Sequence, residues 1–357
     1  MSSPNQFAFE YEEVDDDGKV TSYGGLPIVA EILRRFGASA AITEHIEVPS
    51  RQHDAAWCTE SVAMLMAAGG DCLDDMNLLV DDKGGRGYQP VIAVWAEQDL
   101  VVADEFRDGN VPAGKDTLPL LKRAFGALPE SIVKRRLRAD SALYNLKTLR
   151  WLVDEGIGYT ISADMSAPLR DACVALTEEK WVPLESRENE YVHVAEVDWC
   201  PGDWANKRPR PRYLGIRFSP RQGSLFEGAG PKYLAIVTHR EGDPAHLVRW
   251  HWEKAGTVEH VHDVLKHELG AGTFPCGRFG ANAAWYRIAL LTYNALSPLR
   301  SVALPPILQD ARPKRLRFHV FVQPAEIISH ARTLIARVRK RWHQCLGLSQ
   351  LRLAYAP

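Results

Sequence analysis

The alternation of strand-like and helix-like segments between residues 87 and 164 constrains the fold most. Two strand-like runs, 87–97 and 100–106, flank the turn Gln98-Asp99 and predict a β-hairpin. The segments that follow are a helix at 117–128, a strand at 132–140, a helix at 142–155 and a strand at 158–164. Strands that alternate with helices pack into a sheet covered by helices, so this order predicts an α/β fold with a mixed sheet.

The flanking segments have other patterns. Helical spacing of apolar residues occurs at 25–37 and 54–69, and strand patterns separated by Pro- and Gly-rich turns occur at 190–199, 213–219 and 233–239. Helical patterns return at 243–254, 257–269, 281–299 and 323–342. We therefore expect five parts: an acidic leader with an N-terminal helical region (1–82), the first part of a core (83–177), a β-rich insertion (178–242), the remainder of the core (243–300) and a basic helical C-terminal region (301–357).

Composition excludes several classes of protein. The 357 residues are 46% hydrophobic and 25% charged, as in an ordinary globular protein, and no apolar run approaches the ~20 residues that cross a bilayer. The first residues are acidic, which excludes a secretory signal, and the six cysteines form no C-x-x-C pair. We expect a cytoplasmic protein with no membrane partner.

Charge is segregated along the chain. Residues 1–85 contain 16 acidic and 5 basic residues, whereas residues 301–357 contain 10 basic and 2 acidic ones. A basic end favours a polyanion such as DNA, although a solvated helical surface explains it equally well. Prolines exclude a helix from the segment with Lys207, Arg208, Arg210 and Arg212, and we favour a loop along DNA over a solvated turn.

Two carboxylates are the candidates for chemistry. Asp140 follows a strand and precedes a helix, where ligands gather in α/β sheets, although Asp is also a favoured helix cap. Glu259 begins the helix 257–269, and Lys266 lies on the same helical face; a solvated face is the alternative. Carboxylates from a strand end and a helix suit a hard divalent cation such as Mg²⁺. No H-E-x-x-H motif supports zinc.

Several runs of residues together resemble the bacterial insertion-sequence transposases with a DDE catalytic domain of group 1. They are Gly-Arg-Gly-Tyr-Gln-Pro at 85–90, Arg-Ala-Asp-Ser at 138–141, the helix with Glu259 and Lys266, and Phe-Gly-Ala-Asn-Ala-Ala-Trp-Tyr at 279–286. The resemblance covers nearly the whole chain. It implies a ribonuclease-H-like core with a β-rich insertion, Mg²⁺ or Mn²⁺ as cofactor, and cut-and-paste strand transfer on DNA at terminal inverted repeats and target. A homo-oligomer on DNA is a further expectation.

The resemblance assigns roles to individual residues. Asp140 matches the family's second acidic metal ligand and Glu259 the third, while Lys266 matches a lysine that contacts DNA phosphate. Trp252 and Ala255 stand where related transposases often have Tyr and Arg.

The family's first catalytic aspartate has no counterpart. It lies on the first core strand, upstream of the hairpin, but here the helical region runs through 78–83 directly into that hairpin. An internal deletion that removes the first strand is the simplest explanation; a substitute ligand at Asp81 or Asp82 is the less favoured one. We therefore expect a truncated transposase copy that is impaired in catalysis.

Two other functions stay open. In the first, the chain is a non-catalytic DNA-binding or interaction relic of a transposase, which binds DNA without metal-dependent cleavage. In the second, it is a metal-dependent nuclease that cleaves DNA and never joins an end to a target. The tryptophans Trp181, Trp199 and Trp204 either stack on a flipped base or pack in the core.

Overall fold

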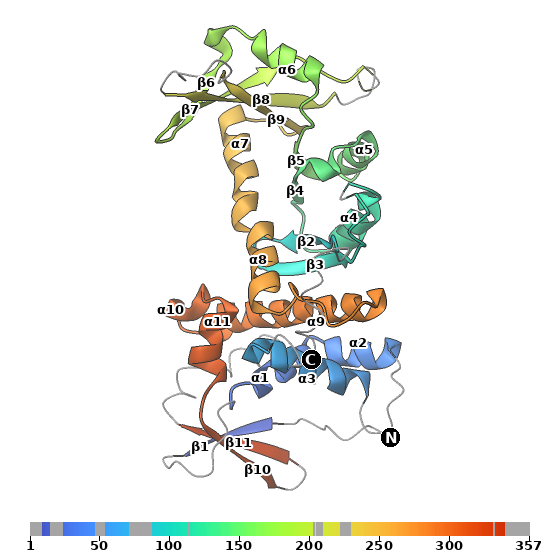
Figure 1. Cartoon of the computed structure of the whole chain (residues 1–357), viewed down its shortest axis with the longest axis vertical. Helices are drawn as coiled ribbons and strands as arrows, with labels where there is room; N and C mark the ends of the chain where they lie inside the picture. Colours follow the sequence, from blue (N-terminus) through green and yellow to red (C-terminus); the bar gives the residue numbers. More distant parts are fainter. Residues whose placement is uncertain are drawn as a thin grey trace. The chain divides into compact units, whose positions relative to one another are not determined.

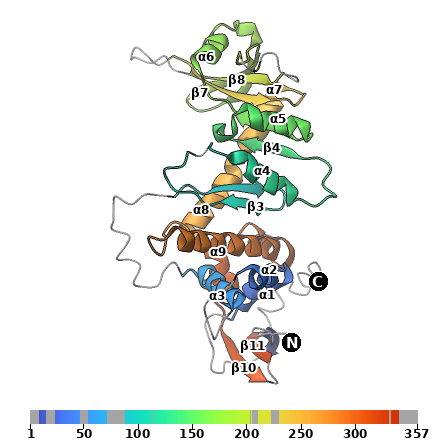
Figure 2. The same cartoon turned by 90° about the vertical axis from the view of Figure 1, so that its right-hand side faces the viewer.

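The computed structural model describes residues 9–14, 24–46, 54–70, 88–112, 114–202, 204, 210–221, 230–330 and 333–339 (Figures 1 and 2). The chain divides into two compact units. The sheet unit comprises Tyr88–Ala93 and Val102–Glu259, and the helical unit comprises Met1–Gly87, Val94–Val101 and His260–Pro357.

The sheet unit is built on six strands in the order β4-β5-β9-β8-β7-β6. Their bounds are β4 (Arg136–Ala139), β5 (Gly158–Ser162), β6 (Val182–Ser186), β7 (Glu190–Val197), β8 (Arg212–Pro220) and β9 (Lys232–Thr238). β4 and β5 are parallel and every other pair is antiparallel, which confirms the predicted mixed sheet. The strands expected in an insertion extend this sheet, because β9 pairs directly with β5.

Helices cover both faces of the six-stranded sheet. They are α4 (Thr117–Gly126), α5 (Leu146–Asp154), α6 (Ala167–Val174) and α7 (Pro244–Trp252). Successive residues of a strand face opposite sides. Accordingly, Tyr213 of β8 packs in one core with α5 and α6, whereas Leu214 packs in another with α7. Figures 1 and 2 show α6 and α7 on opposite faces of the sheet.

Gly215 of β8 permits the close approach of α6. A Cβ at this position would lie 2.9 Å from Cγ2 of Val197 and 3.1 Å from Sγ of Cys173, closer than side chains tolerate without moving. The absence of a side chain here sets how tightly α6 packs on the sheet.

The helical unit contains helices from both ends of the chain. They are α1 (Pro27–Arg35), α2 (Ala38–His45), α3 (Ala55–Ala68), α9 (Phe279–Pro298), α10 (Pro306–Gln309) and α11 (Pro313–Leu316), with the π-helical turns η5 (Leu299–Ala303) and η6 (Arg317–Phe321). Buried Glu60 of α3 joins the first three helices, because its carboxylate accepts hydrogen bonds from Arg34 of α1 (2.8 Å) and Ser39 of α2 (2.7 Å). The described residues 24–70 thus contain three helices, one more than the two helical stretches predicted there.

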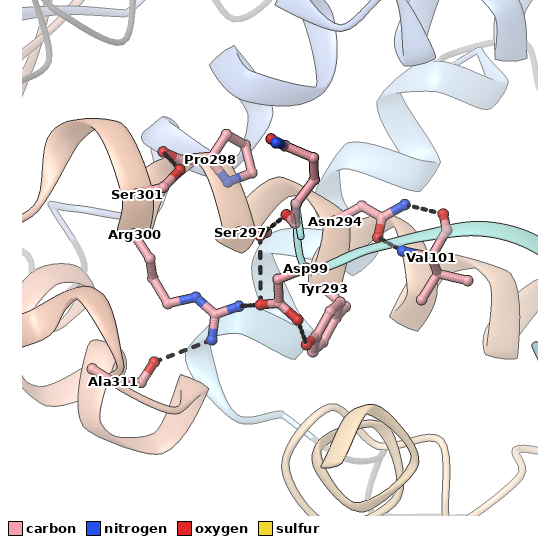
Figure 3. Close-up of polar contacts among 10 residues, drawn as sticks. Asp99, Val101, Tyr293, Asn294, Ser297, Pro298, Arg300, Ser301 and Ala311 are labelled. Atoms are coloured by element: carbon pink, nitrogen blue, oxygen red, sulfur yellow. Dashed lines mark hydrogen bonds and ion pairs between the residues drawn. The ribbon is translucent and has the colours of Figure 1, made fainter. Parts of the chain in front are cut away.

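The predicted hairpin consists of β2 (Val91–Trp95) and β3 (Leu100–Glu105), which form a separate two-stranded sheet. Asp99 in its turn has a positive φ of 51°. Figure 3 shows Tyr293 and Arg300 directed at the Asp99 carboxylate, and each donates a hydrogen bond to it. The side-chain amide of Asn294 in α9 accepts a hydrogen bond from the backbone N–H of Val101 and donates one to its carbonyl oxygen, both at 2.8 Å. Helix α9 therefore holds both the Asp99 side chain and the backbone of β3.

The C-terminal helix expected at 323–342 is wrong. Residues Ala325–His330 form β10 and Thr333–Arg339 form β11, an antiparallel pair, and β11 also pairs in parallel with β1 (Phe9–Val14). The β-branched residues Ile327, Ile328, Ile335 and Val338 favour strands, and pairing with a strand more than 300 positions earlier overrides the helical spacing. The basic C-terminal region is therefore only partly helical.

Other local differences are smaller. The structure adds α6 and β6, and it divides the expected helix 142–155 into the 3₁₀ turn η2 (Ser141–Leu143) and α5. Short 3₁₀ turns, η3 (Glu178–Lys180) and η4 (Glu253–Gly256), precede β6 and α8 (Val258–Glu268). No helix in the described ranges is both long enough and apolar enough to cross a membrane.

Candidate active site

Asp140 lies at the carboxyl end of β4. The strand ends at Ala139, and Oδ1 of Asp140 accepts a hydrogen bond from the backbone N–H of Ala142 at 3.1 Å, which caps η2. The side chain is exposed. Asp140 is therefore both a cap and a free carboxylate, because its second oxygen stays available to a ligand.

The parallel register brings the end of β5 beside Asp140. Arg138 pairs with Thr160 and Ala139 with Ile161, so the next positions along the two strands are Asp140 and Ser162. Carboxyl ends of neighbouring parallel strands are where ligands bind in open α/β sheets. The site thus begins with a carboxylate and a hydroxyl side by side at one edge.

His251 of α7 supports this edge from within the core. Its Nδ1 lies 3.0 Å from Oγ1 of Thr160 and its Nε2 lies 3.1 Å from Oγ of Ser162, and the residue is only 2% exposed. Burial, followed by the charges of Lys254 and Arg138, lowers the pKa of His251 to about 3, so the ring is neutral at pH 7.

The ammonium group of Lys254 completes the cluster. Nζ of Lys254, in η4, donates a hydrogen bond to Oγ of Ser162 at 3.1 Å. We assign the tautomer in which the Ser162 hydroxyl donates to Nε2 of His251 and the histidine proton is on Nδ1, facing Thr160. Burial lowers the pKa of Lys254, while the carboxylates of Asp140 and Glu259 act in the opposite direction.

Asp140 and Glu259 both interact electrostatically with the ammonium of Lys254. Glu259 lies in the first turn of α8, five residues after Lys254, and is exposed like Asp140. The two carboxylates are 119 positions apart in the chain. Both carboxylates act electrostatically on the Lys254 amine, where they oppose the lowering of its pKa by burial.

Arg138 locks α7 against β4. Its Nη1 donates to Oε2 of Glu253 at 2.6 Å and to the backbone oxygen of Trp250 at 3.0 Å, and its guanidinium lies 5.2 Å from the Trp250 ring. The strand that ends in Asp140 is therefore tied to the helix that precedes Lys254.

The donor set fits one hard cation. Carboxylate oxygens are the ligands that Mg²⁺ prefers, and one or two of them with substrate phosphate are the usual set. Within the described ranges, no group of three or more His, Cys, Asp or Glu side chains could hold a metal ion. Asp140 and Glu259 could supply two carboxylate oxygens to such a cation, whose other ligands would be water and substrate phosphate.

The expected DNA-contacting residues have different surroundings. Lys266 of α8 is exposed, seven residues after Glu259 on the same helix. Arg212 forms two hydrogen bonds with the Glu196 carboxylate at 2.8 and 2.9 Å, and Arg210 pairs with Asp198 at 3.0 Å. Lys207 and Arg208 lie outside the described residues, as do Asp81 and Asp82.

The basic C-terminal region pairs partly with the fold itself. Arg312 contacts Asp263 and Glu268, both at 2.5 Å, and Arg317 donates to the backbone oxygens of Met66 and Ala67. These contacts favour the solvated or structural interpretation of that charge for these two arginines.

One comparison with known proteins decides the family. A family model described as Transposase DDE domain group 1 matches residues 83–345, most of the chain. The chain belongs to this family. The match includes Asp140, Glu259 and Lys266 in this transposase, and it confirms the resemblance seen in the sequence motifs. No curated protein matches the chain.

Three residues of the candidate site were missed by sequence reasoning. Ser162, His251 and Lys254 belong to no family motif quoted above. A usable signal was present, because Ser162 ends the strand next to Asp140, and His251 near the end of α7 is followed three residues later by Lys254 in η4. Trp181 and Trp204 are buried, which favours core packing over base stacking for both.

Proposed function

We propose that this transposase performs the DNA cleavage and strand transfer of its family with reduced efficiency, using Asp140 and Glu259 to hold one Mg²⁺ or Mn²⁺. The proposal is supported by the position of Asp140 at the carboxyl end of β4, next to Ser162 of β5, whose hydroxyl accepts a hydrogen bond from Lys254, an amine on which Asp140 and Glu259 both act electrostatically. Side chains with strongly shifted pKa values and exposed carboxylates at such an edge are typical of an active site.

Each residue has a role in this proposal. A bound divalent cation supplies Lewis-acid polarisation of the scissile phosphate. Asp140 and Glu259 provide its protein oxygens, and Lys266 contacts a DNA phosphate as a point charge. Arg210, whose side chain is 45% exposed, is placed to exchange Asp198 for a phosphate, whereas Arg212 is committed to Glu196.

We propose further that the core is ribonuclease-H-like and lacks its first strand. Two observations support this. β4 is the edge strand of the six-stranded sheet, and β2 and β3 form a sheet of their own. In the family, the first core strand carries the first catalytic aspartate, which would join Asp140 and Glu259 as a third carboxylate. Its loss reduces the number of metal ligands, which is the physical reason for impaired catalysis.

The test is a nicking assay on duplex DNA with the ends of the element that encodes the chain, with Mg²⁺ or Mn²⁺. We expect weak cleavage that D140N and E259Q each reduce by at least about 100-fold, because each removes a charged ligand of the cation. The variants D81N and R212M are the controls. Activity that survives D140N, or that D81N abolishes, would contradict the assignment.

A non-catalytic function as a DNA-binding relic is the second candidate. It is favoured by the lack of a three-ligand metal site in the described part of the chain and by the amine beside the two carboxylates. It predicts salt-sensitive DNA binding with no cleavage in either metal. A nuclease function differs from both because cleaved ends would never join a target plasmid.

A further inference from the structure

We propose that the ammonium of Lys254 is a built-in counter-ion of the Asp140–Glu259 pair and competes with a divalent cation for it. The inference rests on the proposed function, since it takes these carboxylates as the metal ligands. Lys254 is then a positioning and inhibitory residue in the metal-free protein.

The location of the amine comes from hydrogen bonds and register. Nζ of Lys254 donates to Oγ of Ser162 at 3.1 Å, and Ser162 is the last residue of β5. The β4–β5 pairing puts Asp140 at the neighbouring position. Glu259 begins α8 directly after the η4 turn that contains Lys254. The amine is therefore held next to the strand end that carries Asp140, and Glu259 follows Lys254 by five residues at the start of α8.

The amine is also held firmly. Ser162 accepts from Lys254 and donates to Nε2 of His251, whose own Nδ1 contacts Thr160 at 3.0 Å. His251 is 2% exposed, so this chain of polar contacts is anchored in the core. An exposed lysine samples many rotamers, whereas Lys254 is partly buried and has a fixed acceptor.

Competition follows from charge. Two carboxylates beside one ammonium leave a local charge of about −1, which is a weaker attraction for Mg²⁺ than the −2 of the bare pair. A cation bound between the carboxylates also repels the ammonium at short range. Removal of the positive charge is therefore expected to strengthen cation binding.

The experiment is a titration of the full chain with Mn²⁺, followed by isothermal calorimetry and by the EPR signal of free Mn²⁺. We expect K254M to bind at least about tenfold more tightly than the wild type, because the local repulsion is gone. K254R keeps the charge and should retain wild-type affinity. K147M, at an exposed lysine of α5, is the matched control and should also bind like the wild type.

The outcomes separate this inference from the proposed function. If K254M and wild type bind Mn²⁺ equally and D140N abolishes binding in both, Lys254 is no competitor and the metal site stands. If binding in K254M is unchanged by both D140N and E259Q, the metal site itself is wrong. Should K254M fail to fold, K254Q against K254R gives the same comparison, and equal affinities for these two overturn the inference.

Discussion

Two clusters of this transposase each bring carboxylate and cation together, and they differ in how fully the charges are matched. In the helical unit, Asp99 accepts hydrogen bonds from Tyr293 and Arg300, and Ser297 lies 3.5 Å from Oδ2 (Figure 3). Arg300 is 6% exposed and also contacts the backbone oxygen of Ala311. One carboxylate thus meets one guanidinium, and the donors saturate it.

The sheet unit shows the opposite arrangement. One amine, Lys254, interacts electrostatically with two exposed carboxylates, and it donates its hydrogen bond to Ser162. An ion pair with one buried partner and saturated hydrogen bonds helps to hold a fold together, whereas unmatched charge at a strand edge is available to a ligand. We therefore expect the Asp99 cluster to matter for stability and the Lys254 cluster to matter for binding.

The largest stability effect is expected at Arg300. R300M leaves the Asp99 carboxylate without its guanidinium partner, and it should lower the free energy of unfolding by about 2.5 kcal/mol. Urea denaturation followed by tryptophan fluorescence measures the loss. R210M removes an exposed ion pair and should cost less than about 0.5 kcal/mol. Equal losses in the two variants would remove the distinction between structural and functional clusters.

The next effect is a pH dependence from His251. Burial, together with the charges of Lys254 and Arg138, lowers its pKa from 6.5 to about 3. The pKa of His251 is lower in the folded than in the unfolded protein. The neutral ring therefore contributes fully to the free energy of unfolding above about pH 6.5, and this contribution is lost as the pH falls towards 3. Between pH 7 and pH 5 the loss is about 2 kcal/mol.

H251N removes this titration and tests the assignment. The variant should show a shallower fall in the free energy of unfolding over the same pH range than the wild type. A parallel fall in both proteins would mean that other groups dominate the acid sensitivity.

A smaller effect is expected at Ser162. S162A removes the acceptor of Lys254 and leaves Nε2 of His251 without its donor, which should cost about 1 kcal/mol. T148V is the matched control, because the Thr148 hydroxyl is buried and has no hydrogen-bond partner in the structure, so its loss should be neutral. If S162A leaves the free energy of unfolding unchanged, the hydrogen bonds that connect His251, Ser162 and Lys254 do not contribute to stability.

The smallest changes in stability are expected at the proposed metal ligands. D140N keeps a capping side chain on η2, and E259Q removes one of two exposed like charges, so each should shift the free energy of unfolding by less than about 0.5 kcal/mol. The same variants should lose cation binding. A destabilisation above about 1.5 kcal/mol would make these residues structural, like Asp99.

The sequence predicted the alternating part of the fold well because local signals there agree. The strand ending at Asp140, the turn at Gln98-Asp99 and the α8 helix with Glu259 were all placed by spacing and turn residues. The C-terminal strands were missed because their partner, β1, lies at the other end of the chain. Local spacing carries no information about such a pairing.

The candidate site divides in the same way. Asp140 and Glu259 were found because each lies next to a recognisable motif or helix start. Lys254 and His251 were not, since their roles depend on α7 packing against β5, which only the folded chain brings about. The ion pairs of Arg210 with Asp198 and of Arg212 with Glu196 could not be predicted either, because they form only once β7 and β8 pair.

The most direct test of the central claim is a crystal structure of the full chain soaked in Mn²⁺, with anomalous diffraction at the manganese edge. The account predicts one strong anomalous peak bonded to carboxylate oxygens of both Asp140 and Glu259, at roughly the 2.0–2.2 Å typical of small divalent cations. A peak bonded to only one of them, or located elsewhere while both carboxylates stay with Lys254, would contradict it.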